Sequence, residues 1–114
     1  MPYVRVETNV EVGAKADEFV AKLSKVVSEA AGKPESYVMI LFNDGLKMSF
    51  SGTLEPAALV TFKSLGLQED RCAPIAERLC AFLARELRVH GKRVYIDFEN
   101  LDGAMLGWDS RTFG

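Results

Sequence analysis

Residues 38–42 of this chain read VMILF, an uninterrupted apolar run. The helix-ending residues Gly32 and Pro34 precede the run, and the turn signal NDG follows it at residues 43–45. An apolar run of this length between such boundaries is typical of a strand that is buried on both faces. We therefore expect a sheet with helices on one face and a further cover on the other.

Two segments have the apolar period of amphipathic helices. One covers residues 19–30, and the other begins near Glu69 and Asp70 and ends near Val89. The segments between them have the composition of strands. We expect strands at residues 2–8, 37–42, 57–65 and 93–98, with a short return strand at residues 46–50.

The order strand, helix, strand therefore occurs twice, and each helix is followed by a Gly-Lys step, Gly32-Lys33 and Gly91-Lys92. This pattern indicates an internal duplication. Right-handed β-α-β crossovers join parallel strands, so two such units give a four-stranded sheet with both helices on one face. We expect this α/β (α+β) fold, with short extra strands, to form one domain over residues 1–114.

The second face of strand 38–42 then lacks a cover within the chain. Leaving several of its side chains in water would cost a few kcal/mol, at about 25 cal/mol per Å² of apolar surface. The sequence therefore predicts self-association, with partner subunits on this face.

The composition disfavours several classes of function. A formal net charge of -2 and a pI near 5.4 give no basic surface for nucleic acid. No apolar run is long enough to span a membrane, and the first residues do not resemble a secretory signal. We expect a cytoplasmic protein, for which any secretion follows a non-classical route.

Metal and redox chemistry also lack support in the sequence. Cys72 and Cys80 lie eight positions apart in one expected helix, too far to bridge each other. The only histidine is His90, and no His, Cys or carboxylate cluster has metal-ligand spacing. We expect no metal and no other cofactor.

Pro2 follows Met1 and is the residue that points to chemistry. Removal of Met1 would leave Pro2 with a free secondary amine. In an apolar pocket the charged amine loses hydration, so its pKa falls towards neutrality and the amine can act as a general base. Proline is common at this position, and with Met1 attached its nitrogen is an amide without basicity. Pro2 alone therefore does not define a catalytic site.

A series of short motifs runs through the whole chain in a fixed order. They are Met1-Pro2, Thr8-Asn9-Val10, Gly32-Lys33-Pro34 with Tyr37, Ser51-Gly52, Glu55-Pro56, Ser64-Leu65-Gly66, Arg93-Val94-Tyr95-Ile96, Gly107-Trp108 and Thr112-Phe113. In combination they resemble the macrophage migration inhibitory factor family of the tautomerase superfamily. Residues 37–40 and 48–52 resemble plant and microbial members more closely than the animal cytokines.

The resemblance implies a homotrimer whose sheets line a barrel, with active sites at the subunit interfaces. It implies cofactor-independent keto–enol tautomerisation of a small aromatic keto acid such as phenylpyruvate, often with isomerisation of a dopachrome analogue. Pro2 would remove a proton next to the ketone and return it to the partner atom. Two alternatives stay open: a signalling ligand that binds a receptor with weak or no catalysis, and a decarboxylase or hydratase that uses the same proline.

The resemblance also implies roles for single residues. Lys33 meets the substrate carboxylate, Ser64 and Leu65 lie beside the proline, and Tyr95 comes from the neighbouring subunit. Without the resemblance, Lys33 would be a cation at a helix end and Tyr95 an ordinary sheet tyrosine. The expected hydrophobic rim consists of Tyr37, Leu106, Trp108 and Phe113.

The chain departs from the animal members at three places. Asp97 replaces an asparagine near the substrate. Its carboxylate would raise the pKa of Pro2 and repel an anionic substrate unless Lys33 or Arg93 neutralises it. Residues 57–60 replace a Cys-x-x-Cys motif, and Val12 replaces an arginine implicated in receptor binding. Oxidoreductase activity is therefore not expected, and a receptor contact is lost.

Overall fold

The computed structural model describes residues 1–114. Its main elements are strands β1 (Pro2–Thr8), β2 (Met39–Asn43), β3 (Ala58–Leu65) and β4 (Val94–Leu101) and helices α1 (Ala16–Ala31) and α2 (Glu69–Leu87). Short 3₁₀ turns are η1 (Gly13–Lys15), η2 (Glu35–Tyr37), η3 (Gly91–Arg93) and η4 (Gly103–Met105), and strands β5 (Gly107–Trp108) and β6 (Arg111–Thr112) form a C-terminal hairpin.

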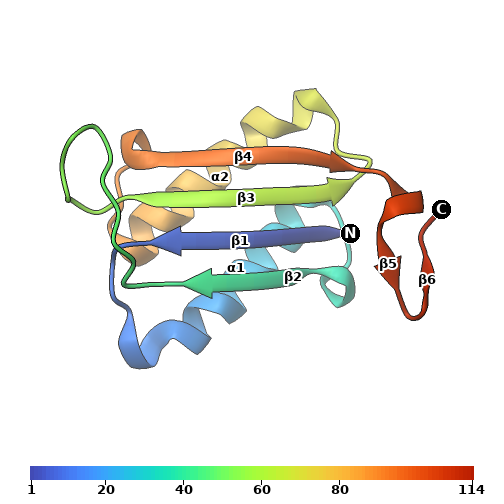
Figure 1. Cartoon of the computed structure of the whole chain (residues 1–114), viewed down its shortest axis with the longest axis horizontal. Helices are drawn as coiled ribbons and strands as arrows, with labels where there is room; N and C mark the ends of the chain where they lie inside the picture. The colour runs from blue at the N-terminus through green and yellow to red at the C-terminus, as the bar shows by residue number, and fades with distance from the viewer.

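The four long strands form one sheet in the order β2-β1-β3-β4. β1 is parallel to β2 and β3 is parallel to β4, whereas the central pair β1 and β3 is antiparallel. Both helices cover the same face of this sheet (Figure 1). The predicted pair of β-α-β units and the predicted one-sided arrangement of the helices are confirmed.

The two units repeat with a constant offset of 56 residues. Tyr3 is beside Met39 in the first unit, and Leu59 is beside Tyr95 in the second. Helix α1 is followed by Gly32 and helix α2 by Arg88, and both residues have left-handed backbone conformations. The predicted equivalence of the two Gly-Lys steps is therefore wrong. Because α2 ends at Leu87, Arg88 takes the place of Gly32, and Gly91 begins η3 instead.

Residues 46–50 do not form the predicted return strand. The Leu46 amide donates to the carbonyl of Thr8 and the Gly45 amide to that of Val10, each at 3.0 Å. The chain therefore crosses the end of β1 on its way to β3, instead of running back along β2 (Figure 1). β4 extends three residues beyond the predicted end at Phe98, because its pairing with β3 continues to Leu101.

The hydrophobic core lies between the sheet and the helices. It contains Val4, Val6, Val60 and Phe62 from the sheet and residues such as Leu23, Leu79 and Phe82 from the helices. Val38, which precedes β2, and Ile40 and Phe42 of β2 pack against this core. Met39 and Leu41 lie on the other face, where they are 60% and 39% exposed.

The open face of the sheet carries charged as well as apolar side chains. Because side chains alternate along a strand, those that follow the buried core positions by one residue point to this face. They include the charged residues Arg5, Glu7, Lys63, Asp97 and Glu99. The prediction of an uncovered face is correct for one chain, but a partner there must match charges as well as apolar side chains.

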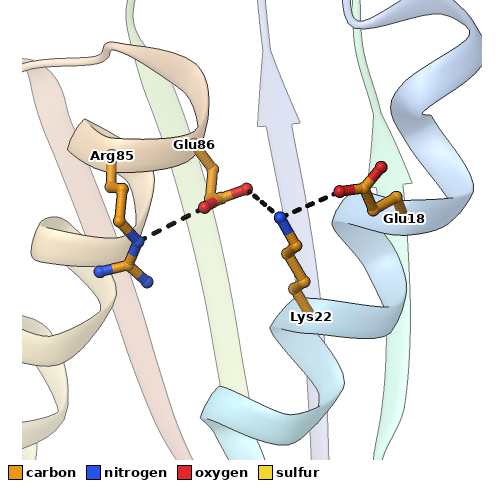
Figure 2. A network of polar contacts seen from close by, with 4 residues as sticks. All are labelled: Glu18, Lys22, Arg85 and Glu86. Carbon is orange, nitrogen blue, oxygen red and sulfur yellow. Dashed lines mark hydrogen bonds and ion pairs between the residues drawn. The ribbon is translucent and has the colours of Figure 1, made fainter.

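The two helices are joined on their outer surface by ion pairs (Figure 2). Lys22 of α1 lies 3.0 Å from Glu18 and 3.3 Å from Glu86 of α2. The hydrogen bond to Glu18 is the largest cause of the raised pKa of Lys22. Lys22 and Glu18 are exposed and Glu86 is half-buried, so these ion pairs contribute little to the stability of the fold.

Candidate functional site

Pro2 and Ser64 mark the end of the sheet at which β1 begins. Pro2 is buried, and its register partner across the sheet is Ser64, which is 2% exposed. Both residues keep the alternation of Val4 and Phe62, so their side chains lie on the face that the helices cover. The first residue of the sheet is therefore sheltered from water.

A pocket of ≈ 220 Å³ adjoins this end of the sheet. Lys33, Ser64 and Leu65 line it, together with Gly66 and Arg71. The structure thus brings together three of the predicted site residues. Pro2 does not line this pocket, but it is the register partner of Ser64, which does. The pocket lies where β3 ends, between the last residues of α1 and the first turn of α2.

Lys33 is held by the end of α1. Gly32 has a φ of 64° and donates to the carbonyl of Glu29, and the Lys33 amide donates to that of Ser28 at 3.1 Å. This is the glycine-dependent helix end described for many α-helices. The Ser28 hydroxyl donates to the Lys33 carbonyl at 2.6 Å. The backbone of Lys33 is therefore fixed, while its ammonium forms no ion pair within the chain.

The surroundings of the terminal amine of Met1 change its pKa at this end of the sheet. The pKa of the Met1 amine is lowered, first by partial burial and then by the positive charge of Lys33. Both causes disfavour the protonated form of an amine. The charge of Lys33 therefore acts at the end of the chain where Pro2 lies.

An aromatic cluster stands beyond the same end of the sheet. Trp108 stacks on Phe113 with ring centroids 5.7 Å apart, and Tyr37 packs edge-on against Trp108 at 5.7 Å. The Leu106 carbonyl accepts a hydrogen bond from the Phe113 amide at 3.2 Å. The four predicted rim residues thus lie near one another: Tyr37 is in η2, Trp108 is in β5, and Leu106 and Phe113 flank the C-terminal hairpin.

Tyr95 and Asp97 lie elsewhere on the sheet. In the β3–β4 register they are beside Leu59 and Thr61, whereas Pro2 is beside Ser64. At about 3.3 Å per residue these positions are about 17 Å and about 10 Å along β3 from Ser64. Both side chains also point to the open face. One chain therefore does not bring them to Pro2.

The Arg93 side chain is hydrogen-bonded to the loop that precedes β3. Its guanidinium donates to the carbonyls of Phe50, Glu55 and Pro56 at 2.8–3.0 Å. The Phe50 ring in turn packs edge-on against Tyr95 at 5.0 Å. Arg93 therefore does not neutralise Asp97, and no other residue forms an ion pair with that carboxylate.

Arg71 is a pocket residue that the sequence analysis missed. Its Nη2 donates to the Ala30 carbonyl at 2.9 Å, which places the guanidinium at the end of α1. Arg71 lies in the first turn of α2, where the helix dipole disfavours a cation. That unfavourable placement is the sequence signal that could have singled it out.

The structure contains a second, separate hollow, but no metal-binding group of side chains and no membrane-spanning helix. No group of three or more His, Cys, Asp or Glu side chains is placed to hold a metal ion. Neither helix combines the length and the apolar character needed to cross a membrane. A larger hollow of ≈ 460 Å³ lies under residues 46–56, but none of the predicted site residues lines it.

This arrangement of sheet and helices is the fold of the tautomerase superfamily, and solved structures share it. A macrophage migration inhibitory factor homologue from Prochlorococcus marinus matches with a TM-score of 0.93 and 34% identity, covering 98% of this chain and 99% of its own. The protein of that name from Trichinella spiralis matches with a TM-score of 0.91 and 31% identity, covering 97% and 99%.

The family model described as macrophage migration inhibitory factor (MIF) matches residues 1–114, and the chain belongs to this family. A homologue from Brugia malayi is 37% identical over 115 residues and covers 100% of both chains. The protein from Xenopus tropicalis is 32% identical, covering 99% of both. These identities do not rank microbial members above animal ones, so the predicted closeness to plant and microbial members stays a prediction.

Proposed function

We propose that this protein is a cofactor-independent keto–enol tautomerase of the phenylpyruvate type, with Pro2 as the general base after removal of Met1. The observation that carries the proposal is the placement of a buried Pro2 beside a pocket that contains Lys33. A dopachrome analogue is a second expected substrate. Family membership supports the reaction class.

The electrostatics of the pocket favour a neutral base. Partial burial and the charge of Lys33 lower the pKa of the Met1 amine, and the Pro2 nitrogen lies one residue deeper in β1. A free amine at Pro2 is subject to the same two effects. Its neutral form takes the proton from the carbon next to the ketone, and the resulting ammonium gives that proton to the ketone oxygen, which yields the enol.

The remaining predicted residues fit roles in binding. The Lys33 ammonium pairs with the substrate carboxylate, since it has no carboxylate partner in the chain. Ser64 and Leu65 form the wall beside Pro2. The aromatic ring of the substrate packs against the cluster of Tyr37, Leu106, Trp108 and Phe113.

A homotrimer supplies the other half of the site in this proposal. Proteins of this family are generally oligomeric. Tyr95 is 67% exposed on the open face, and both Tyr95 and Asp97 are too far from Pro2 of the same chain. A neighbouring subunit that packs at the end of the sheet where β1 begins brings its own Tyr95 and Asp97 to the pocket.

The test requires two measurements: one identifies the first residue of the protein, and the other follows the reaction. Mass spectrometry identifies preparations that begin at Pro2, and the ultraviolet absorbance of the enol follows phenylpyruvate turnover. We expect turnover only from protein that begins at Pro2, and its loss in Pro2→Gly. Turnover that persists when Met1 is retained contradicts the role of Pro2.

The signalling ligand is the second candidate, because the matching relatives carry the name macrophage migration inhibitory factor. Receptor binding does not require a basic Pro2. A Pro2→Gly variant that loses turnover but keeps receptor binding separates the two functions, whereas equal loss of both would link them.

A further inference from the structure

The pocket beside Pro2 contains two cations. Lys33 and Arg71 both line it, and neither forms an ion pair with any carboxylate of the chain. The other polar side chains of the lining, Ser64 and Gln68, are neutral. Because the whole chain carries a formal net charge of -2, this local excess of positive charge does not reflect a basic protein.

The guanidinium of Arg71 is oriented before any ligand arrives. Its Nη2 donates to the Ala30 carbonyl at 2.9 Å, at the C-terminal end of α1. A guanidinium has five N–H donors, so most of them remain for a ligand. Glu69 and Asp70 lie in the same turn of α2, but neither forms an ion pair with Arg71.

The two cations approach the pocket from different elements. Lys33 follows the end of α1, and Arg71 belongs to the first turn of α2. A single carboxylate that pairs with both cations gives each of them one oxygen, so the guanidinium loses its two parallel hydrogen bonds. A ligand with two anionic groups pairs with both, and the planar guanidinium favours a carboxylate that accepts two parallel hydrogen bonds.

We propose that Lys33 and Arg71 bind two separate carboxylates of one ligand, so that the preferred substrate is a 2-oxo acid with a second carboxylate. The inference rests on the proposed function, because it names the substrate class of the same pocket. Lys33 takes the carboxylate next to the ketone, which lies nearer Pro2. Arg71 takes the distal carboxylate and acts as a specificity-determining residue. The pocket of ≈ 220 Å³ suits a small dicarboxylate.

The test compares phenylpyruvate with (4-carboxyphenyl)pyruvate, which differs only by the second carboxylate. In protein that begins at Pro2, kcat/KM is expected to favour the dicarboxylate by about tenfold, as for one charge-assisted hydrogen bond. Arg71→Gln is expected to abolish that preference and Arg71→Lys to restore it in part. Lys92→Gln is the matched control, because it removes one exposed positive charge beyond the other end of α2.

Calorimetry in the Pro2→Gly background measures binding of the same two compounds without turnover. Arg71→Gln is expected to weaken binding of the dicarboxylate by about tenfold more than that of phenylpyruvate. Equal effects on the two ligands, or no effect on either, overturn the inference and leave the proposed function intact. If protein that begins at Pro2 enolises neither compound, the proposed function fails, while the calorimetry still decides whether Arg71 binds the second carboxylate.

Discussion

The Arg93 guanidinium donates to the carbonyl of Phe50 at 3.0 Å and also lies over the ring of the same residue, 5.2 Å from its centroid. Two more hydrogen bonds tie Arg93 to the carbonyls of Glu55 and Pro56. Residues 50–56 contain no regular strand, and Ser51 has a positive φ of 53°. Arg93 therefore holds the loop that supports Tyr95 together with Asn9, whose side chain donates to the carbonyls of Leu54 and Glu55 at 3.2 and 3.0 Å.

Replacement of Arg93 by lysine is expected to loosen the loop. An ammonium has three donors at one point, so it does not span three carbonyls as a planar guanidinium does. We expect faster amide hydrogen exchange in residues 50–56 and a loss of about 1–2 kcal/mol in the free energy of unfolding. Arg85→Lys is the control, because Arg85 is exposed on α2 and bonds no backbone carbonyl. Unchanged exchange in the loop would show that Arg93 does not hold it.

The two helix ends give a pair of predictions with opposite signs. Gly32 and Arg88 occupy equivalent left-handed positions, with φ values of 64° and 58°. A side chain in this conformation costs about 1 kcal/mol. Gly32→Ala is therefore expected to lower the free energy of unfolding by about 1 kcal/mol. Arg88→Gly is expected to raise it by about 0.5 kcal/mol, since the greater unfolded-state entropy of glycine offsets part of the gain.

Chemical denaturation of the two variants measures both effects. A Cβ at Gly32 meets no atom within 4 Å, so the expected loss comes from the backbone and not from a clash. The Arg88 side chain forms no ion pair, so its removal breaks none. If Arg88→Gly destabilises the protein, the left-handed conformation at Arg88 is not strained.

The sequence predicted the elements whose pattern is local, and it missed features that depend on distant partners. The spacing of apolar residues predicts the helices and strands of both β-α-β units, because this spacing reflects the face that each element buries. The sequence predicts a short return strand over residues 46–50. That segment instead follows hydrogen bonds to Thr8 and Val10, which no local pattern encodes.

The same distinction holds for the candidate site. The resemblance to a family gave Lys33, Ser64 and Leu65, and the structure places all three at one pocket. Arg71 enters that pocket only because α2 begins beside the end of α1, which is a tertiary relationship. The positions of Tyr95 and Asp97 follow from the register of β3 and β4, which the sequence does not specify.

Lys33→Gln is expected to change both the pH dependence and the affinity. Lys33 lowers the pKa of the terminal amine, although burial is the larger cause. A base works only when unprotonated, so loss of the Lys33 charge raises its pKa and moves the acid limb of kcat/KM to higher pH. KM for phenylpyruvate should rise about tenfold as the carboxylate loses its partner.

Lys33→Arg is the matched variant, because it keeps the positive charge. The enol assay gives kcat/KM at each pH. The acid limb of this pH profile should lie at nearly the same pH in Lys33→Arg as in the protein without a substitution. An acid limb that does not move in Lys33→Gln would mean that the charge of Lys33 does not reach Pro2.

Asp97→Asn tests whether the neighbouring subunit contributes to the site. The Asp97 carboxylate has no ion-pair partner in its own chain, and Arg93 is occupied by the loop carbonyls. Near Pro2 of a neighbour it would stabilise the protonated amine and repel an anionic substrate. Removing its charge is therefore expected to raise kcat/KM for phenylpyruvate by about tenfold and to move the acid limb to lower pH.

Glu99→Gln is the control for this prediction, because Glu99 lies on the same open face of β4 but pairs with Lys63 at 3.7 Å. Steady-state kinetics of the two variants should separate a local effect on Pro2 from a general change in surface charge. If Asp97→Asn and Glu99→Gln change the kinetics equally, or if neither changes them, Asp97 does not act at the pocket. Since Asp97 is about 10 Å along the sheet from the partner of Pro2 in its own chain, a specific effect requires that it reach the pocket of another subunit.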